Sequence, residues 1–169
     1  MVAVRPGQGS GVVSWALRHA RANGGALEII ASGLEWPDPH GALLRVGHQL
    51  IADGCDVPFA MRSVSVGTPL GLAHSTTGVD LIVLGWRSDQ PSRTEAASCV
   101  AIAIASACPV VIVPVDWRAE PDDGSVLGSE AFAASGHRGA LVERICGATA
   151  PIRIVPTSFI DAVREPVSG

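Results

Sequence analysis

Lysine and tyrosine are absent from this chain of 169 residues, and every one of its twelve basic residues is an arginine. The missing lysine bears on residues 7–11, where glycines alternate between a short apolar segment and a predicted helix. A P-loop needs a lysine after its last glycine for the outer phosphates, followed by a serine or threonine for magnesium. Val12 and Val13 follow instead, so a P-loop kinase or ATPase is not expected.

Charged residues and long apolar runs are also scarce. Only 17% of the residues are charged and the net charge is −4, which speaks against the basic face of a nucleic-acid-binding protein. No apolar run approaches the ~18 residues of a membrane span. Met1 leads directly into an apolar segment without a signal-peptide pattern. We therefore expect a cytoplasmic protein that binds neither nucleic acid nor membrane.

Metal and redox sites find little support in the sequence. The cysteines include no pair at Cys-x-x-Cys spacing, and two of them lie in or beside an apolar predicted helix, where a thiol packs as a small apolar group. The histidines are scattered, and we interpret each as a packing or surface residue. No metal site is predicted. The residues in question are Cys55, Cys99, Cys108, Cys146, His19, His40, His48, His74 and His137.

Apolar and amphipathic segments alternate over residues 2–115. Uninterrupted apolar runs of strand length, such as 79–85 and 108–115, are typical of parallel strands covered on both faces. The pattern predicts an α/β fold with a doubly wound open sheet of five mainly parallel strands and helices on both faces. The predicted strands are 2–4, 26–32, 57–67, 79–85 and 108–115, and the predicted helices are 12–24, 42–54, 68–78 and 95–107.

The composition changes after residue 115. Residues 116–139 are rich in Gly, Ser, Asp and Ala, which predicts a flexible connection. Residues 140–169 form a C-terminal extension with one more helix and a strand at 151–156. We divide the chain into an α/β domain over 1–115, this connection and this extension.

The glycines of residues 7–11 leave two readings open. A dinucleotide-binding turn requires Gly-x-Gly-x-x-Gly or Ala, and Val12 places a branched side chain where the last small residue belongs. A flexible turn between strand and helix is the alternative.

Three stretches resemble the universal stress protein family: residues 14–32, 64–88 and 97–114. The middle one carries a Gly-x-Pro turn, a short predicted helix and an aspartate-led apolar strand that ends in glycine. The resemblance implies an open sheet with strand order 3-2-1-4-5. It also implies, for many members, ATP bound at the carboxyl ends of the strands near the topological switch point.

The phosphate-binding pattern of that family is only partly kept. Its glycines let backbone amides approach the phosphates, and a hydroxyl group at a helix start donates to an oxygen. Here Gly85 and Ser98 match, whereas Ser88 and Ala97 replace glycines, and Arg5 stands where an aspartate usually follows the first strand. If a nucleotide such as ATP or AMP binds, the resemblance places it at Val4, Arg5, Gly85, Arg87, Ser88, Ala97 and Ser98.

Three functions remain open at this point. The favoured one is a universal-stress-type protein that does not bind ATP strongly and acts through dimerisation or a protein partner. The alternative is a nucleotide-binding stress protein with a rearranged phosphate loop. An enzyme is the least favoured, because Asp80 is predicted at the wrong end of its strand and Ser98 has no evident base.

The predicted strand at 109–115 raises the question of what covers the sheet edge. Val110 to Val113 are apolar and uncharged, and an edge of this kind needs a partner. The resemblance implies antiparallel pairing with a second copy, so a homodimer through residues 109–115 is the favoured prediction. The alternative is that the tail strand 151–156 pairs with this edge within one chain, with Arg153 facing solvent.

Overall fold

The computed structural model describes residues 2–4, 10–32, 38–64, 71, 73, 78–87, 92–118, 130–133 and 138–155. The strands in this part of the chain are β1 (Val2–Val4), β2 (Leu27–Ser32), β3 (Phe59–Val64), β4 (Ile82–Trp86), β5 (Val110–Pro114), β6 (Glu130–Ala133) and β7 (Ile152–Val155). The predicted short helix at 68–78 lies mostly outside the described residues.

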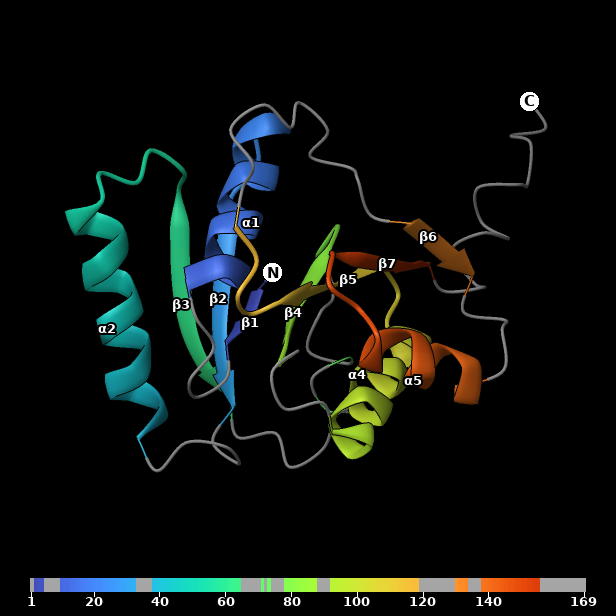
Figure 1. Cartoon of the computed structure of the whole chain (residues 1–169). Coiled ribbons are helices and arrows are strands. Elements are labelled where there is room, and N and C mark those ends of the chain that lie inside the picture. The colour runs from blue at the N-terminus through green and yellow to red at the C-terminus, as the bar shows by residue number, and fades with distance from the viewer. Residues whose placement is uncertain are drawn as a thin grey trace.

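The strands form one mixed sheet in the order β3-β2-β1-β4-β5-β7-β6 (Figure 1). The pairs β1–β2, β1–β4, β2–β3 and β4–β5 are parallel. β7 joins β5 in the antiparallel direction, and β6 pairs parallel with β7. Residues 130–155 thus add a strand–helix–strand unit to the β5 side of the sheet.

The α/β class is confirmed, but the prediction of a five-stranded sheet is wrong in its extent, because the sheet has seven strands. The predicted dimer contact through residues 109–115 is wrong as well, since β5 pairs with β4 on one side and with β7 on the other. The alternative, in which the tail strand pairs with this edge, is confirmed. β6 lies within residues 116–139, where only a connection was predicted.

Four helices flank the sheet in the described part of the chain: α1 (Ser10–Ala22), α2 (Pro39–Ala52), α4 (Arg93–Ala105) and α5 (Arg138–Cys146). The start of α2 follows from local chemistry, because the Asp38 carboxylate accepts a hydrogen bond from the Gly41 amide at 2.8 Å and Pro39 stands at the first helical position. None of these helices is long and apolar enough to cross a membrane.

Two apolar cores lie on opposite faces of the sheet. On one face α1 and α2 pack over side chains such as Ile29, Val83 and Val111. On the other face α4 and α5 pack over residues such as Ile112 and Ile154 (Figure 1). Alternate residues of β5 serve both cores, which explains why this strand is apolar throughout.

Gly11, in the first turn of α1, packs directly against the chain that leaves β5. A Cβ atom at this position would lie 2.5 Å from the Trp117 carbonyl oxygen and 2.8 Å from that of Val115. Both obstacles are backbone atoms, so neither moves aside cheaply. Close packing therefore explains this glycine, whereas residues 7–9 lie outside the described part.

We predict that Gly11→Ala lowers the free energy of unfolding by about 1–3 kcal/mol, because the added methyl group overpacks the contact with residues 115–117. Urea unfolding followed by circular dichroism measures the change. Gly139→Ala is the matched control, since Gly139 also lies in a helix but a Cβ there meets nothing within 4 Å. That variant should be neutral or more stable by up to about 1 kcal/mol. Equal effects of the two substitutions would contradict the packing argument.

Candidate functional site

The carboxyl ends of β1 and β4 bring together three of the residues expected at a nucleotide site. Val4 ends β1, and Gly85 lies on the neighbouring strand β4, where it pairs with Val113 of β5. Arg87 follows β4 directly, is half-buried and interacts within the chain. Arg5 and Ser88 lie outside the described residues.

The other two expected residues lie further away along α4. Ala97 and Ser98 occupy the second turn of this helix, and Ser98 is about 9 Å along the axis from the N-cap residue Ser92. The Ser98 hydroxyl group donates a hydrogen bond to the Thr94 carbonyl oxygen at 3.0 Å. A hydroxyl group in this position satisfies its own helix and is not at the helix start, where a phosphate would bind.

The N-terminus of α4 is capped by the chain itself. The Ser92 hydroxyl oxygen accepts a hydrogen bond from the Glu95 amide at 3.4 Å, and Glu95 places a carboxylate in the first turn. Ser92 and Glu95 have the spacing of a capping box. A negative side chain at this end stabilises the helix dipole and repels a second anion.

The N-terminus of α1 also faces backbone oxygens. The carbonyl groups of Val115 and Trp117 lie against Gly11 in the first turn of α1. The turn that carries them is held by hydrogen bonds from the Val115 amide to the Trp86 carbonyl oxygen at 2.8 Å and from the Trp117 amide to the Pro114 carbonyl oxygen at 3.0 Å. Carbonyl oxygens carry partial negative charge, so they compete with an anion for this helix end.

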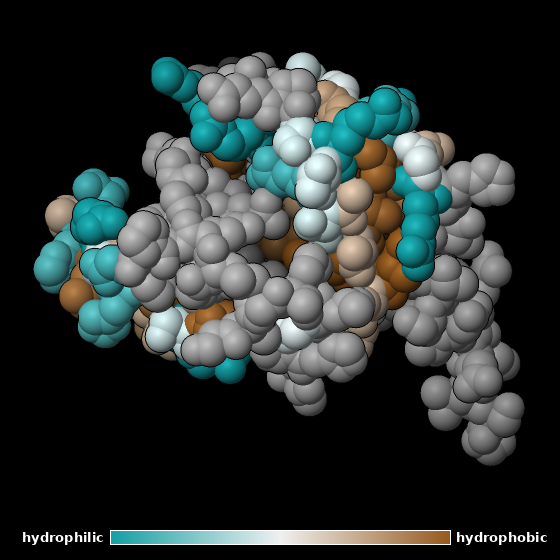
Figure 2. Space-filling model, turned by 90° about the horizontal axis from the view of Figure 1, so that it is seen from below, coloured by the Kyte–Doolittle hydropathy of each residue, from teal (hydrophilic) through white to brown (hydrophobic). Residues whose placement is uncertain are grey.

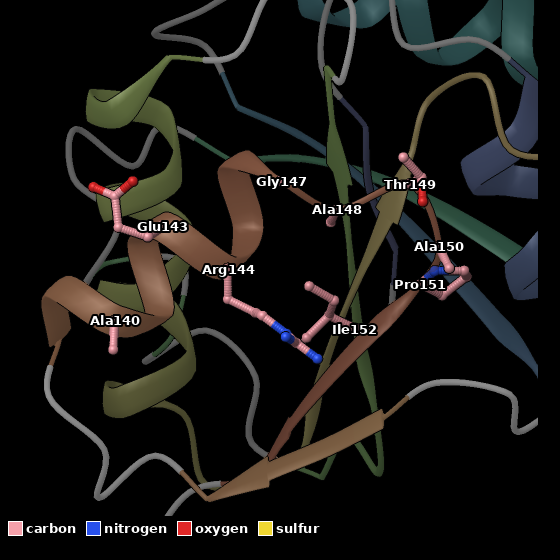
Figure 3. Close-up of a pocket in the computed structure, with 9 residues that line it drawn as sticks. All are labelled: Ala140, Glu143, Arg144, Gly147, Ala148, Thr149, Ala150, Pro151 and Ile152. Atoms are coloured by element: carbon pink, nitrogen blue, oxygen red, sulfur yellow. The ribbon is translucent and has the colours of Figure 1, made fainter.

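A separate hollow of about 630 Å³ lies between the second half of α5 and the start of β7 (Figure 3). Arg144 projects from α5 toward Ile152 of β7, whereas Glu143 points away (Figure 3). Glu143 forms an ion pair with Arg93 at the start of α4. Most of the remaining lining is small and apolar, so this hollow presents few groups for specific recognition. Those lining residues are Ala140, Gly147, Ala148, Thr149, Ala150 and Pro151.

The described residues that were considered for catalysis or metal binding do not come together in a catalytic or metal site. Asp80 is exposed and precedes β4, at the amino end of the strand, opposite to Gly85. The cysteines at 55, 99, 108 and 146 are free thiols. Among the residues that the structure describes, no three His, Cys, Asp or Glu side chains gather as metal ligands do.

No family model, curated protein or solved structure matches this chain.

The sequence also carries a signal that locates the start of α4. Ser92-Arg93-Thr94-Glu95 is a capping-box pattern, and it begins the helix two residues before the predicted start at 95. With this start, Ser98 falls in the second turn and its motif role is lost.

We predict that Ser92→Ala lowers the free energy of unfolding by about 1 kcal/mol, because the N-cap hydrogen bond to the Glu95 amide is lost. Ser98→Ala should be neutral or stabilising by up to about 0.5 kcal/mol, since alanine has the higher helix propensity. Urea unfolding of both variants beside the wild type measures the difference. A larger loss at Ser98 than at Ser92 would contradict this assignment of the cap.

Proposed function

We propose that this protein is a universal-stress-type, non-enzymatic binding protein that forms a homodimer and does not bind ATP strongly. The observation that carries the proposal is the division of the sheet edges. β5, the favoured dimer strand from the sequence, is paired on both sides, whereas β3 is the last of the described strands at the other end of the sheet and lies beside exposed apolar side chains.

Weak ATP binding is supported by the charges around the expected phosphate site. Glu95 places a carboxylate in the first turn of α4, and the carbonyl oxygens of Val115 and Trp117 lie against the first turn of α1. An ATP phosphate at either helix end would have to displace or approach these negative groups. The Ser98 hydroxyl group, which the family motif would use, bonds to Thr94 instead.

The proposed dimer surface is an apolar patch formed by Leu44, Ile51 and Met61, hereafter the α2–β3 patch. These side chains are 41%, 69% and 37% exposed, and all lie at one end of the sheet. Leu44, Gly47 and Ile51 follow helical spacing on one flank of α2, and a Cβ atom at Gly47 would lie 2.7 Å from the Met61 Cε atom. Met61 therefore fills the notch above Gly47 and joins the strand to the helix flank.

The outer edge of β3 and the α2–β3 patch are suited to contact with a second copy of the chain. Among the strands that the structure describes, none lies beside the outer edge of β3, so its backbone groups can pair with an antiparallel copy. Arg62 is the one charged residue of β3, and it is ion-paired with Glu28 at 2.8 Å. Two β3 strands would thus meet without unpaired like charges. In the space-filling view, α2 at the left shows brown side chains among teal ones (Figure 2).

We predict that isothermal titration calorimetry detects no saturable ATP binding in the low-micromolar range. Glu95→Gln should bind ATP more tightly than the wild type, because it removes the charge from the start of α4 but keeps the polar capping group. Low-micromolar binding by the wild type would favour the alternative of a nucleotide-binding stress protein.

We predict that the wild type elutes with a molar mass near twice 17.3 kDa in size-exclusion chromatography with light scattering. Ile51→Glu and Leu44→Glu should elute as folded monomers, because a buried carboxylate without a partner opposes association. Ala140→Glu is the matched control at an exposed helix position at the other end of the sheet, and it should remain dimeric. A monomeric wild type at high concentration would contradict the dimer and leave the ATP prediction unaffected.

A further inference from the structure

Arg153 interrupts a row of apolar residues that crosses the sheet beneath α1. The strand register places Ile29, Val83 and Val111 in one row, through Val2 of β1, and Arg153 is the partner of Val111 on β7. Ile29, Val83 and Val111 are buried in the core under α1 and α2. Antiparallel partners project to the same face of a sheet, so the Arg153 side chain extends this apolar row. Arg153 is half-buried, so it is less exposed than the solvent-facing position expected from the sequence.

One nitrogen of the Arg153 guanidinium group is left without a hydrogen-bond partner in this position. This atom, Nε, is buried. The carboxylates of Asp56, Glu28 and Glu143 each form an ion pair with an arginine other than Arg153. A buried charged donor without an acceptor is costly and rare in native proteins, so a missing acceptor is the simplest explanation.

His19 presents a second unsatisfied nitrogen to the same region. It lies on α1, where its ring stacks on Trp15 with centroids 5.2 Å apart, and its Nδ1 atom is buried without a partner. His19 and Val83 together line a hollow of about 620 Å³ under α1. Val83 and Arg153 are two strands apart in one row, about 10 Å, a distance that an arginine side chain largely spans.

The direction of the pKa shift of His19 agrees with a position near Arg153. Burial lowers the pKa of His19, and the positive charges of Arg153 and of the chain's amino group lower it further. The acidic residues that line the hollow are Glu28, which is paired with Arg62, and the exposed Asp80. Arg153 and His19 therefore bring a positive charge and two unpartnered nitrogens to the region between α1 and β7.

We propose that Arg153 and His19 form a binding site for a small oxyanion, a phosphate or carboxylate group, held between α1 and β7. The guanidinium group donates hydrogen bonds to two oxygens of such a group in a fixed geometry. The imidazole of His19, on the facing helix α1, donates one further hydrogen bond to the anion. The hollow beside His19 has room for the remainder of an organic ligand. The site is separate from the α2–β3 patch and from the carboxyl ends of the strands, so it goes beyond the proposed function.

The test compares melting temperatures of the full chain in phosphate, sulfate and acetate, with sodium chloride at equal ionic strength as the reference. At least one of the three anions should raise the melting temperature of the wild type above that in chloride. Arg153→Met should lose this increase, with an affinity lower by about tenfold or more, whereas Arg138→Met, at an exposed position of α5, should keep it. Phosphate and sulfate as the better ligands would assign a phosphate group, and acetate would assign a carboxylate.

Two further measurements separate an anion site from a structural role. In chloride alone, Arg153→Met should be at least as stable as the wild type, because a buried donor without a partner is removed. Sulfate keeps its charge between pH 5 and 8, so its binding should raise the pKa of His19 in an NMR titration, and its affinity should rise as the pH falls. The same anion response in Arg153→Met and wild type, or no response beyond chloride, would overturn the proposal and leave water as the partner of both nitrogens.

Discussion

The antiparallel pairing of β7 with β5 is the contact on which the rest of the molecule depends. β5 is buried on both faces and apolar along its length, so its outer edge tolerates water poorly. β7 covers this edge with the register Val110 to Ile154 and Ile112 to Ile152. The same strand carries α5 onto α4, which completes the core on that face. One pairing thus decides which strands remain at the two edges of the sheet.

The N-termini of α1 and α4 show how a chain can satisfy its helix ends with its own groups. An α-helix leaves unsatisfied amides at its N-terminus, and these must find acceptors. In α4 the acceptor is the Ser92 hydroxyl group, and beside α1 the carbonyl groups of Val115 and Trp117 pack close. In this chain, therefore, oxygens of its own side chains and backbone lie at the helix ends where a phosphate group would otherwise bind.

Much of the fold was predictable from the sequence, because the apolar runs predicted as strands form β4 and β5 in the structure. The strand that pairs with the outer edge of β5 was not predictable, since a second copy of β5 and the tail strand have equally suitable apolar patterns. The tail strand prevails because it is tethered, so its pairing is intramolecular and its effective concentration is high. β6 was missed because Glu130–Ala133 is half alanine and lacks the β-branched residues typical of strands.

The candidate site was less predictable than the fold for a related reason. A shift of the α4 start by two residues is small for a helix prediction, but it decides whether Ser98 lies near the helix end or within the second turn. The alternation of Ile152, Arg153 and Ile154 correctly predicts that the Arg153 side chain projects from the face of the sheet opposite to the two isoleucines. What occupies that face depends on α1, which lies far away in the sequence.

The order in which the chain is synthesised gives the late position of β7 a further consequence. β5 is complete about 40 residues before β7 emerges, and at 5–20 residues per second this delay lasts about 2–8 s. During that interval a strand of four apolar residues and a proline has one uncovered edge. A nascent chain of this protein therefore passes through a stage in which association with a neighbouring chain competes with its own completion, and slower translation of residues 115–155 would lengthen that stage.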